Sequence, residues 1–269
     1  MHGYDANDFT KIVYSSNING KLSYFFDEYN FDYVFHLAAF VNLRKSIEEP
    51  KKCFQTNVVG SINVIDLCIK HKVKRLIFAS TGGAIYSPST PLPWQEDSQL
   101  DPQSPYGLSK LWIEQYLKLT NQIHGLNYSI LRYGNVYGPR QDPKGEAGVV
   151  SIFLDSLIQG KTLKMFGNGE QRRDFVYVDD VVQANVLMMN ESKNEIYNVG
   201  SNYSLTINEV AREIADQLGV TPNWEYLPEI KGEVFETKLS YDKIHNNCGW
   251  KPKISFNEGI KKTIEWRKL

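Results

Sequence analysis

The chain has 269 residues, which is enough for one large domain or for a core domain with a smaller companion. Lysine and arginine number 30 and aspartate and glutamate 31, so the net charge of −1 gives no electrostatic case for binding nucleic acid. With 42% apolar residues, the composition is that of a globular chain rather than a disordered one. No apolar run approaches the roughly 20 residues of a membrane span, and no secretory leader is visible at the start.

The first half of the sequence alternates short apolar runs with longer helical patterns. The apolar runs at 33–38, 75–80 and 128–133 are continuous rather than alternating, as in parallel strands that are covered on both faces. Helical patterns at about 51–71 and 105–123 lie between them. This succession of strand and helix predicts a doubly wound α/β sheet with parallel strands.

The second half differs, since a loop rich in glycine, proline and charge at 138–148 separates it from the strands before it. Further helical patterns lie near 149–159, 178–190, 206–218 and 257–267.

The helix expected at 105–123 has recognisable signals at its start. Ser104 suits the N-cap and Pro105 suits the first turn. Two apolar stripes run along roughly opposite faces, one of Leu108, Trp112, Tyr116 and Leu119 and one of Tyr106, Lys110, Ile113 and Leu117. A helix that is apolar on two sides is expected to pack on two sides.

Tyr106 and Lys110 stand four residues apart on this helix, which places their Cβ atoms about 5–6 Å apart on one face. An ammonium beside a phenol favours the phenolate and lowers the phenol pKa from about 10 towards neutrality. A phenol tuned in this way is a general acid and base for interconverting an alcohol and a ketone. Taken alone, the pair is more often a solvated surface pair.

Two hydroxyl residues, Ser80 and Thr81, stand at the end of the apolar run at 75–80 and precede Gly82 and Gly83. Hydroxyls at the carboxyl end of a strand lie on the ligand side of an open α/β sheet, where one could share a proton with a tyrosine. The alternative is a strand-end cap followed by a glycine turn, which is equally compatible with these residues.

The order of these motifs resembles the extended short-chain dehydrogenase/reductase family, in particular nucleotide-sugar epimerases of the UDP-glucose 4-epimerase type. The similarity extends over almost the whole chain, in segments 32–39, 46–50, 57–63, 79–86, 104–110, 131–139, 166–180, 232–234 and 249–252. It implies a Rossmann-like NAD-binding part over 1–139 and about 170–200. It also implies a smaller α/β part that binds the nucleotide sugar, over about 140–169 and 201–269.

The resemblance assigns roles residue by residue. The expected catalytic residues are Tyr106, Lys110, Thr81 and, as a second choice, Ser80. The expected cofactor-binding residues are Asn17, Ile18, Leu37, Ala38, Ala39, Asn57, Tyr106, Lys110 and Tyr133. The expected substrate-binding residues are Asn135, Arg173, Lys231 and Glu233. The expected ligands are NAD and a UDP-sugar, and a homodimer is expected through the helices near 51–71 and 105–123.

Several positions depart from the family pattern. Gly82 stands where many of these epimerases carry a serine or threonine, and Asn17 stands where an aspartate is usual. Ile230, followed by Lys231, replaces an arginine that is common near the diphosphate. The family also opens with a strand, a GxxGxxG turn and a helix that receives the cofactor pyrophosphate, and this sequence contains no GxxGxxG. We therefore expect an N-terminally truncated Rossmann-like sheet that lacks its first βαβ unit, and hence an incomplete sequence.

The leading functional hypothesis is an NAD-dependent UDP-sugar 4-epimerase that acts by transient oxidation at the sugar 4-position. One alternative is a sugar-nucleotide dehydratase or decarboxylase of the same family, although the dehydratases carry acidic residues where this chain has Gly82 and Gly83. The other is a non-catalytic module that binds a nucleotide sugar. No short motif specifies which sugar is bound.

Three cysteines, Cys53, Cys68 and Cys248, form no CxxC pair and are odd in number. This pattern suits reduced thiols better than a disulfide framework or a metal site. We therefore expect a cytoplasmic protein that holds no metal.

Overall fold

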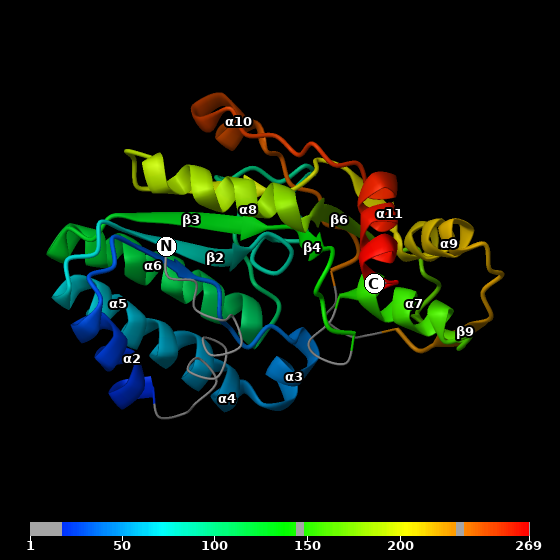
Figure 1. Ribbon diagram of the computed structural model, residues 1–269, viewed down its shortest axis with the longest axis horizontal. Helices are drawn as coiled ribbons and strands as arrows, with labels where there is room; N and C mark the ends of the chain where they lie inside the picture. Colours follow the sequence, from blue (N-terminus) through cyan, green and yellow to red (C-terminus); the bar gives the residue numbers. More distant parts are fainter. Residues whose placement is uncertain (1–17, 144–147, 230–233, 269) are drawn as a thin grey trace. The chain divides into compact units, whose positions relative to one another are not determined.

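The computed structural model describes residues 18–143, 148–229 and 234–268 (Figure 1). Contacts divide the chain into two compact units. Unit 1 comprises Met1–Ser80, Ser104–Ile130 and Glu191–Glu195, and unit 2 comprises Thr81–Gln103, Leu131–Asn190 and Ile196–Leu269. The chain passes five times from one unit to the other, and three of these boundaries fall inside strands. Each unit is therefore described by itself.

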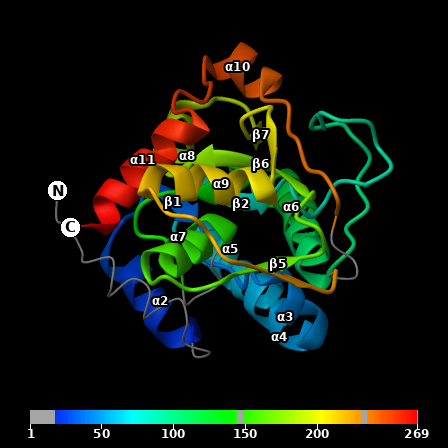
Figure 2. The ribbon, with the colours of Figure 1, turned by 90° about the vertical axis from the view of Figure 1, so that its right-hand side faces the viewer.

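Unit 1 holds the amino-terminal helices and the beginning of the main sheet. Its elements are α2 (Ile18–Glu28), β1 (Tyr33–His36), α3 (Leu43–Glu48), α4 (Pro50–Phe54), the π-helix η1 (Gln55–Val59), α5 (Gly60–Lys70), nearly all of β2 (Arg75–Thr81), α6 (Pro105–His124) and the start of β3 (Tyr128–Tyr133). Strands β1 and β2 are parallel, from Tyr33 opposite Arg75 to His36 opposite Phe78. Helices α2, α5 and α6 lie on the same side of β2 (Figures 1 and 2).

The main sheet has four strands in the order β1-β2-β3-β7. Every residue of β2 is buried, which explains why its sequence is a continuous apolar run rather than an alternating one. The parallel arrangement confirms the predicted Rossmann-like fold class.

Helix α6 begins and ends as its sequence predicts. The Ser104 side chain accepts a hydrogen bond from the amide of Gly107, Pro105 lies in the first turn, and Gly125 ends the helix in the left-handed conformation. The face that carries Lys110 and Ile113 is buried. The opposite stripe stays open within this chain, since Leu108, Trp112 and Leu119 are exposed. The expectation of packing on both faces is therefore met on one face only.

Unit 2 contains the remaining strands and the carboxyl-terminal helices. Its elements are β4 (Asn135–Tyr137), α7 (Val149–Ile158), β5 (Leu163–Phe166), β6 (Arg172–Tyr177), α8 (Val178–Leu187), the 3-10 turn η2 (Met188–Asn190), nearly all of β7 (Glu195–Val199), β8 (Ser204–Thr206), α9 (Ile207–Leu218), β9 (Trp224–Leu227), α10 (Asp242–Cys248) and α11 (Phe256–Arg267). Strands β4, β6 and β8 form one sheet in that order, and β5 pairs with β9 in parallel.

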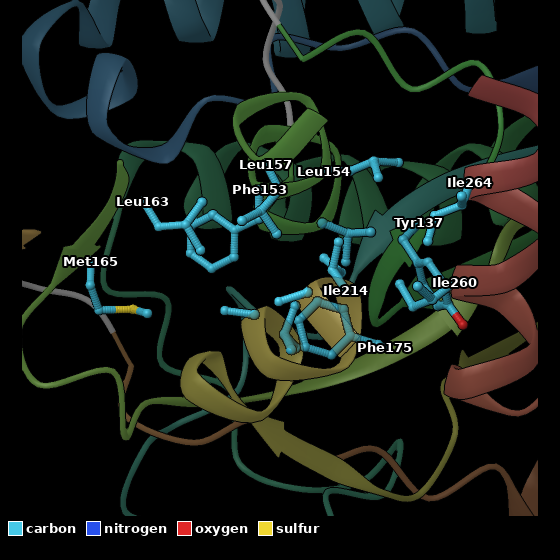
Figure 3. Close-up of a cluster of buried hydrophobic side chains, with 14 of the residues drawn as sticks. Tyr137, Phe153, Leu154, Leu157, Leu163, Met165, Phe175, Ile214, Ile260 and Ile264 are labelled. Carbon is cyan, nitrogen blue, oxygen red and sulfur yellow. The ribbon is translucent and has the colours of Figure 1, made fainter. Parts of the chain in front are cut away.

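The core of unit 2 lies among α7, α9, α11 and the sheet of β4 and β6 (Figure 3). Phe153 and Leu157 from α7 face Ile214 from α9, and Phe175 and Tyr137 contribute aromatic rings from the two strands. Fully burying each large apolar side chain contributes about 1.5–3 kcal/mol. This cluster therefore holds β4 and β6, which carry two of the expected substrate-binding residues, in a fixed register.

The helices expected from the second half of the sequence form within a few residues of their predicted bounds, as α7, α8 with η2, α9 and α11. The short helices α3 and α10 and the β5–β9 pair were not predicted from the sequence. The predicted division into a cofactor-binding part and a substrate-binding part depends on where ligands bind, so it stays a prediction. No helix within the described ranges is both long and apolar enough to cross a membrane.

Candidate active site

Lys110 is a buried charged residue of unit 1. Its ammonium donates a 2.7 Å hydrogen bond to the carbonyl oxygen of Ala79 and lies 4.8 Å from the centre of the Phe78 ring, while only 3% of the residue is exposed. Burial lowers the pKa of Lys110 to about 7. Tyr106 lies one helical turn earlier and is half-buried. Helix α6 thus places the Lys110 ammonium at the carboxyl end of β2, where open α/β sheets bind ligands, with Tyr106 one turn before it.

The two candidate hydroxyls at the end of β2 differ in their surroundings. The Ser80 hydroxyl donates a 2.6 Å hydrogen bond to a carboxylate oxygen of Glu114 on α6, and both residues are buried. The one proton of the Ser80 hydroxyl is therefore already donated within unit 1. Thr81, the next residue, is the last of β2 and is 9% exposed. This difference favours Thr81 over Ser80 as the hydroxyl that meets a ligand.

Asn57 lies in the π-helical turn between α4 and α5, a feature that is frequent at functional sites. Its carboxamide oxygen accepts from the amide of Phe40 at 2.7 Å, and its nitrogen donates to the Phe40 carbonyl at 3.0 Å and to the Ser109 hydroxyl at 2.9 Å. One side chain thereby fixes the segment after β1 to the π-helix and to α6.

Leu37, Ala38 and Ala39 occupy that segment, directly after β1. Leu37 is 55% exposed, and the two alanines are half-buried with only a methyl group each. Small, part-exposed residues just beyond the carboxyl end of a parallel strand let a ligand approach the backbone closely.

His36 ends β1 and is neutral. Its Nε2 lies 2.7 Å from the hydroxyl of Ser61, which itself donates to the carbonyl of Asn57. Since the hydroxyl has one proton to give, Nε2 carries the hydrogen of the imidazole. Burial, together with the charge of Lys110, lowers the pKa of His36 to about 3.

In unit 2, Tyr133 is held at both its ring and its backbone. The phenol donates a 2.9 Å hydrogen bond to the side-chain oxygen of Asn185 on α8, and the Tyr133 carbonyl accepts from the amide of Gly82 at 2.8 Å. Burial raises the pKa of Tyr133 above its ordinary value. Tyr133 is therefore a fixed neutral ring, and the turn that follows Thr81 lies against its backbone.

Asn135 and Arg173 come from neighbouring strands of one sheet. Asn135 on β4 is opposite Phe175 on β6, and Arg173 lies two residues before Phe175, so the three side chains share one face of the sheet. The Arg173 guanidinium donates to the carbonyls of Arg172 and Phe235, at 2.8 and 3.0 Å. The structure thus brings these two expected substrate-binding residues together in unit 2.

Three expected site residues, Asn17, Lys231 and Glu233, lie outside the described residues. Ile18 is the first residue of α2.

Several polar residues of these networks were not singled out from the sequence. Glu114 follows Lys110 by four residues, so its place on the buried face of α6 could have been inferred from helical spacing. Asp174 is fully buried and its carboxylate accepts from the amide and hydroxyl of Ser201 and from the amide of Leu239. Asn185 contacts a tyrosine 52 residues earlier, and no local pattern signals such a pair.

The residues of unit 1 suit a dinucleotide cofactor at the carboxyl ends of β1 and β2. The supporting observations are the small, part-exposed wall after β1 and a buried lysine aimed at the end of β2. A lysine ammonium is a natural hydrogen-bond donor to ribose hydroxyls. Together with the Tyr-x-x-x-Lys spacing, this arrangement defines an enzyme of the short-chain dehydrogenase/reductase class.

The sequence matches the NAD dependent epimerase/dehydratase family over residues 12–200, and the chain belongs to this family. The chain is 33% identical to the UDP-glucose 4-epimerase of Mycolicibacterium smegmatis, over 99% of this chain and 85% of that protein.

The chain is also similar to solved structures of epimerases. The Thermotoga maritima UDP-glucose 4-epimerase, solved with UDP-glucose, superposes with a TM-score of 0.90 at 41% identity, covering 95% of this chain and 82% of that one. The Thermus thermophilus UDP-glucose 4-epimerase in complex with NAD gives a TM-score of 0.87 at 38% identity, covering 92% and 81%.

Proposed function

We propose that this chain is an NAD-dependent UDP-sugar 4-epimerase, in which Tyr106 is the acid and base that acts on the sugar 4-hydroxyl. The observation that carries this proposal is the buried ammonium of Lys110, held at the carboxyl end of β2 one turn after Tyr106. The similarity to epimerases that were solved with UDP-glucose or with NAD supports the same reaction and the same two ligands.

The chain's own residues manage the proton. Tyr106 as phenolate takes the proton of the 4-hydroxyl, and as phenol it returns the proton when the 4-keto sugar is reduced on its other face. Lys110 stabilises the phenolate and binds the nicotinamide ribose, and Thr81 donates a hydrogen bond to the reacting oxygen. When bound, NAD would supply the hydride acceptor for the sugar C4 and the hydride donor for the return step. Leu37, Ala38, Ala39 and Asn57 form and fix the wall beside the cofactor, and Asn17 and Ile18 contact its adenosine half.

The substrate is held by its diphosphate while the sugar turns. Asn135 and Arg173, on one sheet face, bind the diphosphate, and an arginine fork offers paired donors to phosphate oxygens. Lys231 and Glu233 complete this subsite. Tyr133 flanks the nicotinamide as a neutral ring. These roles assign 1–139 and about 170–200 to the cofactor, and about 140–169 and 201–269 to the nucleotide sugar.

A dehydratase is the second candidate from the same family. Eliminating water requires an acid beside the catalytic turn, and the residues after Thr81 are glycines. Gly82 has no room for a side chain, because a Cβ there would overlap the methyl groups of Leu239. These observations favour epimerisation over elimination.

We also propose a homodimer and a cytoplasmic location. The exposed apolar stripe of α6, formed by Leu108, Trp112, Leu119 and Ile123, is the surface through which two copies associate. Cys53, Cys68 and Cys248 form no disulfide in the described part of the chain, and Cys53 and Cys68 are buried. Reduced thiols suit a reducing compartment.

The test of the reaction is to incubate the purified chain with NAD and UDP-galactose or UDP-N-acetylgalactosamine and to separate the products by chromatography. Formation of UDP-glucose or UDP-N-acetylglucosamine is expected. A chain that binds NAD and interconverts no UDP-sugar is not a 4-epimerase. A chain that binds a UDP-sugar, does not bind NAD and shows no turnover is the non-catalytic module. Chromatography with light scattering tests the dimer, which a Leu108→Glu variant is expected to dissociate.

A further inference from the structure

Two consecutive residues at the end of β2 are bound by two buried charged groups of α6. The Ala79 carbonyl accepts from the ammonium of Lys110 at 2.7 Å, and the Ser80 hydroxyl donates to the carboxylate of Glu114 at 2.6 Å. Lys110 and Glu114 stand four residues apart on the same helical face and are 3% and 0% exposed. A carboxylate therefore lies beside the buried ammonium, one turn further from Tyr106.

We infer that Glu114, held by Ser80, is a positioning residue that keeps Lys110 charged and seated on the end of β2. The inference rests on the proposed role of Lys110 in supporting the phenolate of Tyr106. It assigns a function to a carboxylate that contacts neither substrate nor cofactor in the proposed mechanism, and it makes Ser80 a partner of Glu114 rather than a catalytic hydroxyl.

Charge balance gives the physical reason. Burial disfavours the ammonium form of Lys110, and a carboxylate nearby favours it. Other titratable groups also interact with the charge of Lys110: the Cys53 thiol from α4 and the imidazole of His36 from β1. Tyr106 precedes Lys110 by four residues on the same helix. His36 is neutral, and an ordinary thiol, with a reference pKa of about 8.5, carries little charge at pH 7. Glu114 is therefore the carboxyl group that acts on Lys110 from its own helix and favours the ammonium form.

The substitution Glu114→Gln isolates this charge, because its amide oxygen still accepts from Ser80 while the negative charge is removed. The experiment follows the Cε resonances of ¹³C-labelled lysine against pH in the full chain without ligands, and a Lys110→Arg spectrum identifies the Lys110 signal. We expect the Lys110 midpoint, about 7 in the parent chain, to fall by about one pH unit in Glu114→Gln.

Two matched variants separate this effect from its alternatives. Cys53→Ala removes the thiol near Lys110 and is expected to shift the midpoint by much less. Glu28→Gln removes an exposed glutamate from α2 and is expected to change nothing. A folded Glu114→Gln chain with the parent midpoint, or a larger shift in Cys53→Ala, overturns the inference. Should Glu114→Gln not fold, Ser80→Ala decides in its place: a shift in the same direction supports the inference and an unchanged midpoint overturns it.

Turnover adds an independent readout. If the chain epimerises UDP-galactose, the loss of kcat at high pH is expected to move to lower pH in Glu114→Gln by the same amount as the lysine midpoint. If even the parent chain shows no turnover, the proposed function fails, but the lysine titration still decides the role of Glu114.

Discussion

Asn57 binds both backbone polar atoms of Phe40, a residue 17 positions earlier in the chain, with its carboxamide oxygen 2.7 Å from the amide and its nitrogen 3.0 Å from the carbonyl. The segment fixed in this way follows the carboxyl end of β1, which in a parallel sheet is the ligand side. A single buried amide thus takes the place of a strand partner for Phe40.

Asn57→Ala is expected to lower the free energy of unfolding by about 2–4 kcal/mol, because it leaves the two backbone groups of Phe40 without their partner and each such buried group costs about 1–3 kcal/mol. Urea unfolding followed by circular dichroism measures the change. Gln122→Ala, at an exposed position of α6, is the control and is expected to change stability by less than about 0.5 kcal/mol. A loss of stability no greater than that of the control would mean that these hydrogen bonds contribute nothing.

Tyr106→Phe is expected to lower kcat for epimerisation by about 10²–10⁴-fold, the usual contribution of a general acid and base, while the free energy of unfolding stays near that of the parent chain. Steady-state assays over several UDP-sugar concentrations measure kcat separately from KM. Tyr24→Phe makes the same substitution at an exposed tyrosine of unit 1 and should leave kcat unchanged. Comparable rates for the two variants would remove Tyr106 from the chemistry.

How far the sequence predicts this molecule depends on whether a signal is local. The caps of α6 lie within a few residues of its ends, so Ser104 and Pro105 could be assigned correctly from the sequence. The continuous apolar run of β2 likewise reports burial on both faces. Helix α3 has a single buried residue, Ser46, and so leaves no apolar periodicity to detect.

The polar pairs are harder to predict, because each depends on two elements meeting in space. Ser80 could be recognised as a hydroxyl at a strand end, yet its partner Glu114 lies 34 residues later on α6. The resemblance ranked Thr81 before Ser80 as the catalytic hydroxyl, but it offered no physical reason. The packing of α6 on β2 supplies one, because the Ser80 proton is donated to Glu114.

The chain is expected to lose stability in acid through His36. Its pKa is about 3 in the folded chain against an ordinary 6.5, so between these values the unfolded chain binds more protons and stability falls as the pH falls. The expected slope is about 1 kcal/mol per pH unit between roughly pH 6 and 4. His36→Gln keeps a donor for Ser61 and should flatten this slope, whereas His124→Gln, at an exposed histidine, should not. Equal slopes in both variants would assign the acid sensitivity to other groups.

Asp174→Asn is expected to destabilise the chain by about 2–4 kcal/mol, although it changes one atom. Each carboxylate oxygen of Asp174 accepts from a backbone amide, one from Ser201 and the other from Leu239. In either orientation the new amide group would face one of these donors with a donor of its own. Urea unfolding measures the loss, with the exposed Asp216→Asn as the control. A loss as small as in that control would show that the two loops do not depend on the carboxylate.

Gly82 and Leu239 are expected to be coupled. A Cβ at Gly82 would overlap both methyl groups of Leu239, which is fully buried, so Gly82→Ser should cost about 1–3 kcal/mol. Gly83→Ser is the control, because a Cβ there meets only one atom, at 3.9 Å. Leu239→Ala alone should cost about 2–5 kcal/mol through its cavity. The loss of stability in the double variant should be smaller than the sum of the two single losses by at least about 1 kcal/mol, because the serine enters the space that the leucine vacated. Additive losses in this double-mutant cycle would contradict the steric reason for glycine at position 82 and would leave the departure from the family pattern at this turn without a structural cause.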